Sequence, residues 1–334
     1  GSFFEELGIP DPDINLEVGS GSHAVQTAEV MRRFEPVIDT HRPSCVLVVG
    51  DVNSTLACTL VSVKRGIPVV HVEAGLRSYD RAMPEEINRV LTDQIADLLY
   101  TTERSAENNL IREGIAPERI RFVGNVMIDS LLHNREFART PTETVAANGR
   151  DPELLACDAG YGVVTLHRPS NVDDAETLTS LLGVLRELAH QLPLVFALHP
   201  RTRANIERFG LGPLIDNPQL ILLPPQGYLE MLGLMAGARI VLTDSGGLQE
   251  ETTALGIPCL TMRENTERPI TVEQGTNTMV GRDTTAIRQQ ADEILAGRGK
   301  QGKLPELWDG HAAERIATDL AAWLLDRHFV NAKA

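Results

Sequence analysis

The stretch Ile240-Val241-Leu242-Thr243-Asp244-Ser245-Gly246-Gly247-Leu248-Gln249-Glu250-Glu251 decides how this chain folds. It begins with an uncharged apolar run, which suits a strand buried on both faces of a parallel sheet. Two glycines follow, and apolar residues then recur at helical spacing until Gly256 and Pro258 end the helix. The pattern predicts a strand, a glycine turn and a helix N-terminus. Such a turn exposes backbone N–H groups at the positive end of the helix dipole, where a phosphate binds well.

Two interpretations of this turn remain open at this point. An ordinary strand-to-helix connection also uses glycines for geometry alone, so Ser245, Gly246 and Gly247 do not establish a ligand by themselves. Glu251 lies about one helical turn further along, in position to accept hydrogen bonds from ribose hydroxyls. The rest of the sequence has to decide between a phosphate site and a plain connection.

Length and charge narrow the classes of function. The chain has 334 residues, of which 42% are hydrophobic, and this is enough for two domains with separate cores. The net charge of −15 disfavours non-specific binding to nucleic acid or to an anionic membrane. No apolar run approaches the roughly 18 residues that a membrane-spanning helix needs. We therefore expect no nucleic-acid partner and no membrane partner.

The four cysteines, Cys45, Cys58, Cys157 and Cys259, form no CxxC pair. We interpret all four as buried thiols of a reducing compartment and expect a cytoplasmic protein. Metal binding is not expected, because the sequence has no HxH, HExxH or paired Cys/His spacing.

Strand and helix patterns alternate along the whole chain, which predicts βαβ units with parallel sheets. Polar residues directly follow several predicted strands, at the edge where open α/β sheets bind ligands. A lone residue of this kind is usually a helix cap, but several from separate units are difficult to explain as caps. We expect two Rossmann-like halves that face a cleft, with a crossing near Gly124-Asn125. The residues that follow strands are Asp51, Glu73, His167, Arg168, His199 and Ser245.

Three carboxylates of the first half, Asp51, Glu73 and Glu85, are candidates for proton transfer, because crowded carboxylates raise one another's pKa. The alternative for Glu85 is a purely structural role, as an acidic residue that interacts with the dipole in the first turn of the helix beginning at Pro84. That helix carries an apolar stripe, which we expect to face the core. The stripe consists of Ile87, Val90, Leu91, Ile95, Leu98 and Leu99.

Motifs spread from about Phe3 to the last predicted helix resemble the non-hydrolysing UDP-N-acetylglucosamine 2-epimerases in order and spacing. They are Gly50-Asp51-Val52-Asn53-Ser54, His71-Val72-Glu73-Ala74-Gly75-Leu76-Arg77, Pro84-Glu85-Glu86-Ile87-Asn88-Arg89, Val123-Gly124-Asn125, Thr165-Leu166-His167-Arg168, Thr243-Asp244-Ser245-Gly246-Gly247-Leu248-Gln249-Glu250-Glu251 and Thr266-Glu267-Arg268-Pro269.

The resemblance implies a glycosyltransferase-B-like architecture of two Rossmann-like domains, with the last helix returning to the first domain, and a homodimer. We expect the first domain over residues 1–124 and 315–334 and the UDP-binding domain over 125–314. The implied reaction interconverts UDP-GlcNAc and UDP-ManNAc through elimination of UDP, a 2-acetamidoglucal intermediate and re-addition of UDP. The resemblance implies no metal and no nicotinamide cofactor.

The resemblance also assigns roles to single residues. Asp51, Glu73 and Glu85 match the family's catalytic carboxylates, and His167 matches its catalytic histidine. The substrate-binding candidates form a second set. Ser245, Gly246 and Gly247 match contacts to the diphosphate, and Glu251 matches a contact to the ribose. Arg168 matches a position near the nucleotide. Arg168 and His199 are also the candidates for the site of a second, activating UDP-GlcNAc.

The sequence departs from the family pattern in three places. The family's first strand, its Gly-Thr-Arg-Pro-Glu-like loop and the helix that follows have no counterpart, so the fold is expected without this first βα unit. The chain instead opens on Phe3-Phe4-Glu5-Glu6-Leu7, which reads as the end of a helix. Ser170 stands where many members carry Glu, and His199 is followed by Pro200-Arg201 instead of Asn-Pro.

Three other functions stay open on the sequence. An epimerase of a modified sugar, such as UDP-2,3-diacetamido-2,3-dideoxyglucuronate, would want an additional cation, for which Arg77, Arg81 and Arg201 are candidates. A retaining glycosyltransferase would not need three carboxylates around the sugar C2. A non-catalytic nucleotide-sugar binder is the third alternative.

Overall fold

The computed structural model describes residues 7–331, which form two compact units. The first unit comprises residues 10–129 and 306–331, and the second comprises residues 7–9 and 130–305. Phe3 and Phe4, where the sequence predicts the end of a helix, lie outside the described residues.

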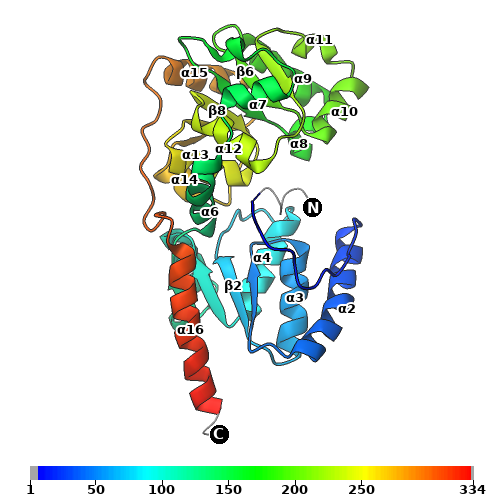
Figure 1. Cartoon of the computed structure of the whole chain (residues 1–334), viewed down its shortest axis with the longest axis vertical. Helices are drawn as coiled ribbons and strands as arrows, with labels where there is room; N and C mark the ends of the chain where they lie inside the picture. Colours follow the sequence, from blue (N-terminus) through cyan, green and yellow to red (C-terminus); the bar gives the residue numbers. More distant parts are fainter. Residues whose placement is uncertain (1–6, 332–334) are drawn as a thin grey trace. The chain divides into compact units, whose positions relative to one another are not determined.

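The first unit is built on a parallel sheet of four strands in the order β1-β2-β3-β4 (Figure 1). These strands are β1 Val46–Val49, β2 Val69–Ala74, β3 Leu98–Thr101 and β4 Ile120–Phe122. Its helices are α2 His23–His41, α3 Asn53–Lys64, α4 Pro84–Ile95, α5 Arg104–Arg112 and α16 Ala312–Asn331, and α6 Val126–Asn134 continues into the second unit.

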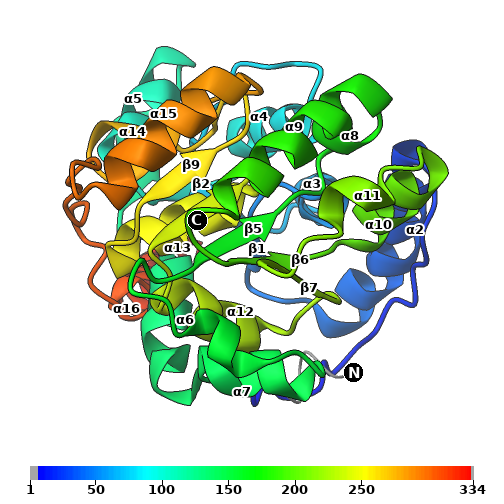
Figure 2. The same ribbon diagram turned by 90° about the horizontal axis from the view of Figure 1, so that it is seen from above.

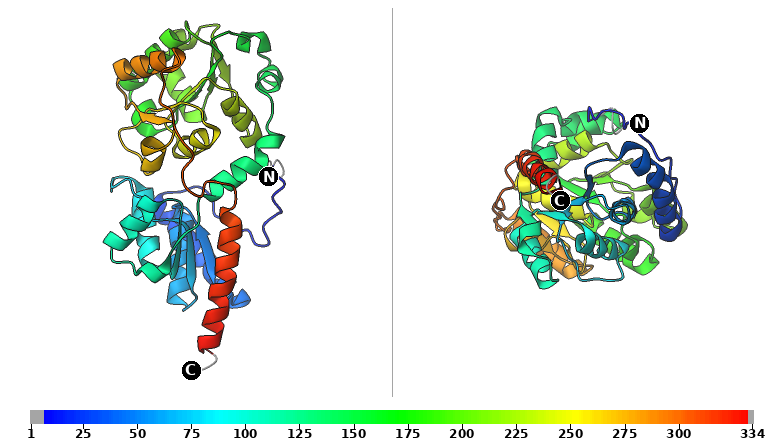
Figure 3. Two further views of the ribbon diagram at one scale, coloured as in Figure 1. Left: turned by 90° about the vertical axis from the view of Figure 1, so that its left-hand side faces the viewer. Right: turned by 90° about the horizontal axis from the view of Figure 1, so that it is seen from below.

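The long helix α16 covers one face of this sheet, as Figures 1 and 3 show. Ile316, Leu320 and Trp323 pack against an apolar cluster that includes Val70 and Tyr100 of the neighbouring strands. A second cluster on the opposite face joins strand residues to Leu110 of α5. The sheet of the first unit is therefore covered by helices on both faces, as parallel sheets usually are.

The apolar stripe of α4, which begins at Pro84, does not face the core as predicted. Ile87 and Leu91 of the expected core stripe are 45% and 46% exposed, whereas Glu86, Arg89 and Asp93 are buried. The polar side is turned inward because its charged groups pair with residues of the loops after β1 and β2. A buried charge is tolerated when it is paired in this way.

The second unit contains a parallel sheet of six strands in the order β10-β9-β8-β5-β6-β7. The strands are β5 Gly162–Thr165, β6 Leu194–Ala197, β7 Leu220–Leu223, β8 Ile240–Thr243, β9 Cys259–Thr261 and β10 Asn277–Met279. Helices α9 Ala175–Leu188 and α15 Thr284–Leu295 cover one face, and α7 Pro141–Ala147 and α12 Tyr228–Ala236 cover the other (Figure 2). The remaining helices are α8 Pro169–Val172, α10 Pro200–Arg208, α11 Gly212–Ile215, α13 Gly246–Leu255 and α14 Pro269–Glu273.

The interpretation of all four cysteines as buried is wrong for Cys157, which is exposed. Cys259 is buried, Cys45 and Cys58 are half-buried, and all four thiols are free. Burial raises the pKa of the Cys58 and Cys259 thiols to about 11. Within residues 7–331, no helix is both long enough and apolar enough to cross a membrane.

Candidate active site

Asp51 lies at the carboxyl end of β1 and is held at both its backbone and its carboxylate. Its Oδ2 accepts hydrogen bonds from Arg89 Nε at 3.1 Å and Nη2 at 2.5 Å. Its backbone carbonyl accepts a hydrogen bond from Asn88 Nδ2 at 2.9 Å. The Asp51 side chain is still 28% exposed, so the carboxylate remains accessible to a substrate.

Glu73 lies inside β2, where the sequence predicts it just beyond the strand. The register with β3 shifts between Val72 and Ala74, and Glu73 in this bulge has a φ of 70°. A positive φ is uncommon for residues other than glycine, and backbone strain of this kind is concentrated at functional sites. A Cβ placed on Gly50 would lie 3.4 Å from Glu73 Oε2, so this carboxylate reaches the residue next to Asp51. The structure therefore brings the Asp51 and Glu73 regions together.

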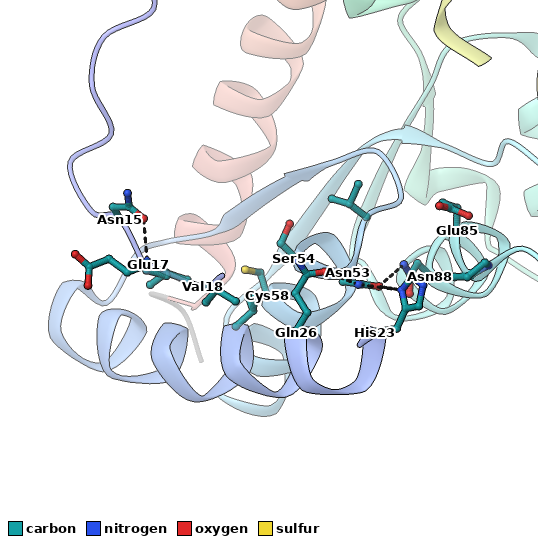
Figure 4. Close-up of a pocket in the computed structure, with 14 residues that line it drawn as sticks. Asn15, Glu17, Val18, His23, Gln26, Asn53, Ser54, Cys58, Glu85 and Asn88 are labelled. Carbon is teal, nitrogen blue, oxygen red and sulfur yellow. Dashed lines mark hydrogen bonds between the residues drawn. The ribbon is translucent and has the colours of Figure 1, made fainter. Parts of the chain in front are cut away.

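The two adjacent glutamates at the start of α4 have different environments. Glu86 is buried and accepts hydrogen bonds from Ser78 N, Ser78 Oγ, Tyr79 N and Arg89 Nη1, so its role is structural. Glu85 is half-buried and lines a cavity of about 470 Å³. Figure 4 shows Glu85 and Asn88 of α4 on this cavity together with Asn53. Glu85 is thus the member of the pair that a substrate can reach.

His167 follows β5 and is anchored by a buried carboxylate. Its Nδ1 lies 2.8 Å from Oδ1 of Asp244, which also accepts hydrogen bonds from the backbone N–H groups of His167 and Arg168 and from Asn171 Nδ2. Burial alone would raise the pKa of Asp244, but the hydrogen bond and charge of His167 hold it below its usual value. A partner on Nδ1 orients the ring and leaves Nε2 for other contacts. His167 itself is 38% exposed.

The glycine turn forms as predicted, with Ser245 as the N-cap of α13 and Gly246 as its first residue. A Cβ on Gly246 would lie 2.5 Å from Glu267 Oε1 and 3.0 Å from Arg268 Nη1. No side chain other than hydrogen fits there without displacing these groups. Asp244 connects this turn to His167, because it directly precedes Ser245 and binds the histidine ring.

The Arg268 guanidinium lies at this turn, where it is paired with two carboxylates. Its Nε lies 2.7 Å from Glu250 Oε2, and its Nη1 lies 2.5 Å from Glu267 Oε1. Burial would raise the pKa of Glu267, but Arg268 and Arg263 lower it to about 2. The sequence pattern pointed to this loop only through the motif Thr266-Glu267-Arg268-Pro269 and gave Arg268 no role.

Glu251 is 5% exposed, and burial raises the pKa of its carboxyl to about 7. A hydrogen bond from Tyr228 opposes this shift, and the neighbouring charge of Glu250 adds to it. The group therefore changes its charge near neutral pH, more than one turn into α13.

We expect Glu251→Gln to stabilise the protein more at high pH than at low pH. The pKa of Glu251 is raised from 4.5 to about 7 on folding. Between these pH values the carboxyl ionises in the unfolded chain but not in the folded protein, so a rise in pH favours unfolding. Removing the group should therefore raise the free energy of unfolding by about 2 kcal/mol more at pH 8 than at pH 5.5. Urea unfolding at the two pH values measures this difference. Exposed Glu207→Gln is the control, and equal gains for Glu251→Gln at both pH values would contradict the assignment.

The remaining candidates of the second unit surround His167. The ring of exposed His199 has its centroid 5.7 Å from that of His167, and its Nδ1 accepts the backbone N–H of Arg201 at the start of α10. Arg168 is half-buried, and its backbone N–H donates to Asp244. The structure thus places His167, Arg168, His199 and Ser245 near one another.

Of the three arginines considered for a sugar carboxylate, Arg77 and Arg201 are paired with acidic residues, whereas Arg81 is exposed. Arg77 is buried, with Nη1 2.7 Å from Asp93 Oδ2 and Nε 2.8 Å from Glu113 Oε1. Arg201 Nε donates to Asp173 Oδ1 at 2.7 Å. Among residues 7–331, no group of three or more His, Cys, Asp or Glu side chains is placed to hold a metal ion.

A family model described as UDP-N-acetylglucosamine 2-epimerase matches residues 1–321 of this sequence. The chain belongs to the UDP-N-acetylglucosamine 2-epimerase family. It is 43% identical over 317 residues to a UDP-N-acetylglucosamine 2-epimerase of Methanocaldococcus jannaschii, covering 94% of this chain and 85% of the relative. It is 42% identical over 322 residues to a UDP-2,3-diacetamido-2,3-dideoxy-D-glucuronate 2-epimerase of Pseudomonas aeruginosa, covering 96% of this chain and 86% of that relative.

A solved structure supports the same family. The M. jannaschii UDP-GlcNAc 2-epimerase in complex with UDP-GlcNAc and UDP matches with a TM-score of 0.80 and 40% identity, covering 94% of this chain and 86% of the other. Together with the two parallel sheets, this match confirms the predicted α/β class of the glycosyltransferase-B-like epimerases.

Proposed function

We propose that this chain interconverts UDP-GlcNAc and UDP-ManNAc. The proposal rests above all on Asp51 and Glu73, which lie at the carboxyl ends of β1 and β2, with the Glu73 carboxylate close to Gly50 beside Asp51. Membership of the epimerase family supports it, as does the glycine turn of Ser245 to Gly247 at the start of α13.

The proposed reaction has two half-steps. A carboxylate removes the proton from C2 of the sugar, the electron pair of this bond forms a C1–C2 double bond, and UDP leaves from C1 with the electrons of the C1–O bond. UDP then adds back to C1 of the 2-acetamidoglucal, and C2 receives a proton on the opposite face. Asp51, Glu73 and Glu85 are the proposed proton carriers, and general acid–base groups typically contribute about 10²–10⁴-fold each.

The second unit is proposed to hold the leaving group. A diphosphate at the N–H groups of Ser245 to Gly247 would meet the positive end of the α13 dipole, which stabilises the charge that develops on UDP. His167, oriented by Asp244, is the proposed catalytic histidine, and Glu251 the ribose contact.

UDP-2,3-diacetamido-2,3-dideoxy-D-glucuronate is the second candidate substrate, because the P. aeruginosa relative is almost as similar as the M. jannaschii one. Its sugar carboxylate needs an unpaired cation. Arg77 and Arg201 are both bound to acidic residues, which leaves exposed Arg81 as the candidate cation. We favour the uncharged sugar because the family model and the M. jannaschii relative both name UDP-N-acetylglucosamine.

Proton NMR of the anomeric signals, recorded with each substrate in turn, tests this choice. The proposal predicts that UDP-GlcNAc gives a mixture with UDP-ManNAc and that the glucuronate reacts much more slowly. A faster reaction of the glucuronate would reverse the assignment.

We also propose that Arg168 and His199 bind a second, activating UDP-GlcNAc. The proximity of His199 to His167 supports this, since an activator there would adjoin the catalytic histidine. Pure UDP-ManNAc should then react slowly until a small amount of UDP-GlcNAc is added. If the added UDP-GlcNAc does not change the rate of the reaction from UDP-ManNAc, the proposed activating site is wrong.

We further propose a homodimer that buries the outer side of α4, where Ile87 and Leu91 are 45% and 46% exposed. Sedimentation should give twice the chain mass of 36.5 kDa. Leu91→Glu should shift the mass toward the monomer by placing a charge in an apolar contact, whereas Val25→Glu at a 58% exposed position of α2 should not. A dimer that Leu91→Glu leaves intact would exclude α4 as the interface.

A further inference from the structure

His71 is a fully buried histidine to which the proposed reaction gives no role. It lies on β2, and both of its ring nitrogens face acceptors. Nδ1 lies 2.7 Å from Asp93 Oδ1, and Nε2 lies 2.8 Å from the backbone carbonyl oxygen of Gly50. A neutral imidazole has only one N–H to donate, so both contacts are hydrogen bonds only when the ring is an imidazolium.

The surrounding charges point to the same protonation state. Asp93 Oδ2 accepts hydrogen bonds from Arg77 Nη1 and the Gly75 N–H, and Arg77 in turn binds Glu113. The two carboxylates, Asp93 and Glu113, balance the charges of Arg77 and a protonated His71. With a neutral His71 this largely buried cluster would carry a net negative charge, which is costly.

The wider surroundings of the ring are mostly acidic. Burial alone would lower the pKa of His71, but Asp93, the Gly50 carbonyl and the charge of Glu73 raise it above its usual value. Beyond Gly50 lies Asp51, which is paired with Arg89. The charged groups around the ring are thus Asp93 and Arg89 from α4, Arg77 from the loop after β2, Glu113 from the end of α5, Glu73 from β2 itself and Asp51 from the loop after β1.

His71 also connects the two candidate catalytic carboxylates. The Gly50 carbonyl that it binds belongs to the peptide group leading into Asp51, and the Gly50 N–H donates to Val72 O at 3.1 Å. Glu73 reaches the same glycine from the bulge of β2. The ring therefore lies where a displacement or a loss of charge would affect both Asp51 and Glu73.

We propose that His71 is a positively charged positioning residue, which holds the Gly50–Asp51 peptide against β2 and places a cation beside the Glu73 carboxylate. This inference rests on the proposed epimerase function. A nearby cation favours the charged form of a carboxylate, so the buried imidazolium favours the ionised form of Glu73.

His71→Gln tests the charge while retaining a donor for the Gly50 carbonyl. We expect kcat to fall about 10- to 100-fold with little change in KM, because Asp51 is misplaced and Glu73 holds its proton more firmly. The acidic limb of the kcat/KM profile should move up by about one pH unit. Asp93→Asn should move it in the same direction, since the ring then loses the partner that keeps it protonated. Exposed His190→Gln on the second unit is the matched control and should leave the profile unchanged.

The double variant His71→Gln/Asp93→Asn separates the charge from a merely structural role. It leaves Arg77 and Glu113 balanced, so thermal stability should recover toward that of the unmodified protein. The acidic limb should stay shifted, because the cation beside Glu73 is still missing. A double variant that regains both stability and the original pH profile would overturn the proposal.

The charge state can be measured without any activity. Nitrogen-15 NMR of the nine histidines, with His71 assigned through the Gln variant, should show both ring nitrogens of His71 protonated at pH 7.5. A neutral tautomer would overturn the proposal even if the enzyme is active. An inactive protein with a protonated His71 would instead count against the epimerase function. If His71→Gln does not fold, Asp93→Asn and the spectrum of the unmodified protein decide the matter, the His71 signal being the one that Asp93→Asn shifts.

Discussion

Asp51→Asn, Glu73→Gln and Glu85→Gln should each lower turnover by roughly 10²–10⁴-fold while UDP affinity stays nearly unchanged. Each substitution keeps the size of the side chain and removes its capacity to carry a proton. The nucleotide contacts are assigned to the second unit, so a carboxylate of the first unit should not alter UDP binding. The expected signature is a fall in kcat with UDP binding preserved.

Steady-state kinetics and UDP titration by calorimetry measure the two quantities. Glu35→Gln is the matched control, since Glu35 is 56% exposed on α2 of the same unit. Its turnover should stay within about twofold of the parent, as exposed sites usually tolerate substitution. Turnover near the parent value in all three carboxylate variants would leave only structural roles for these residues.

Gly246→Asp should abolish UDP binding, with an affinity loss of at least about 100-fold. A Cβ at this position would lie 2.5 Å from Glu267 Oε1, and the new carboxylate would add a negative charge where a diphosphate is expected. Arg268 Nη1 lies 3.0 Å from the same point but is already paired with Glu267, so the new carboxylate would add to the negative charge at the turn. Steric and electrostatic effects therefore act in the same direction.

Gly183→Asp is the control for this variant, because a Cβ on Gly183 in α9 would meet nothing within 4 Å. It should bind UDP as the parent does. Circular dichroism and thermal melting establish that Gly246→Asp is folded. A folded Gly246→Asp protein with unchanged UDP affinity would remove the glycine turn from the nucleotide site.

Local patterns in the sequence predicted the strand ends well. Asp51, His167 and Ser245 follow β1, β5 and β8 as expected, because a buried apolar run that stops at a polar residue marks the edge of a parallel sheet. The short strand β10 was missed, since its residues Asn277–Met279 have no apolar run to mark them.

Contacts between distant segments were not predictable in the same way. The inward turn of Arg89 and Asp93 on α4 depends on partners in the loops after β1 and β2, and it overrides the apolar stripe of that helix. The same holds for the bulge at Glu73, which needs the register of β3 to be known. Single-sequence periodicity does not contain this information.

The candidate site shows the same division. Its residues could be named from motifs, but the groups that hold them could not. Asp244 was visible only as part of the glycine-turn motif, whereas its contact with His167 Nδ1 joins two strands about eighty residues apart. Arg268 likewise acquires a role only because its loop returns to Gly246.

The most direct test of the central claim is the fate of the C2 proton. UDP-GlcNAc is incubated with the protein in deuterated water, and the sugar signals are followed by proton NMR. Epimerisation through loss of the C2 proton predicts that its signal disappears from both UDP-GlcNAc and UDP-ManNAc as deuterium enters. A folded, UDP-binding protein that leaves the C2 proton in place would contradict the account.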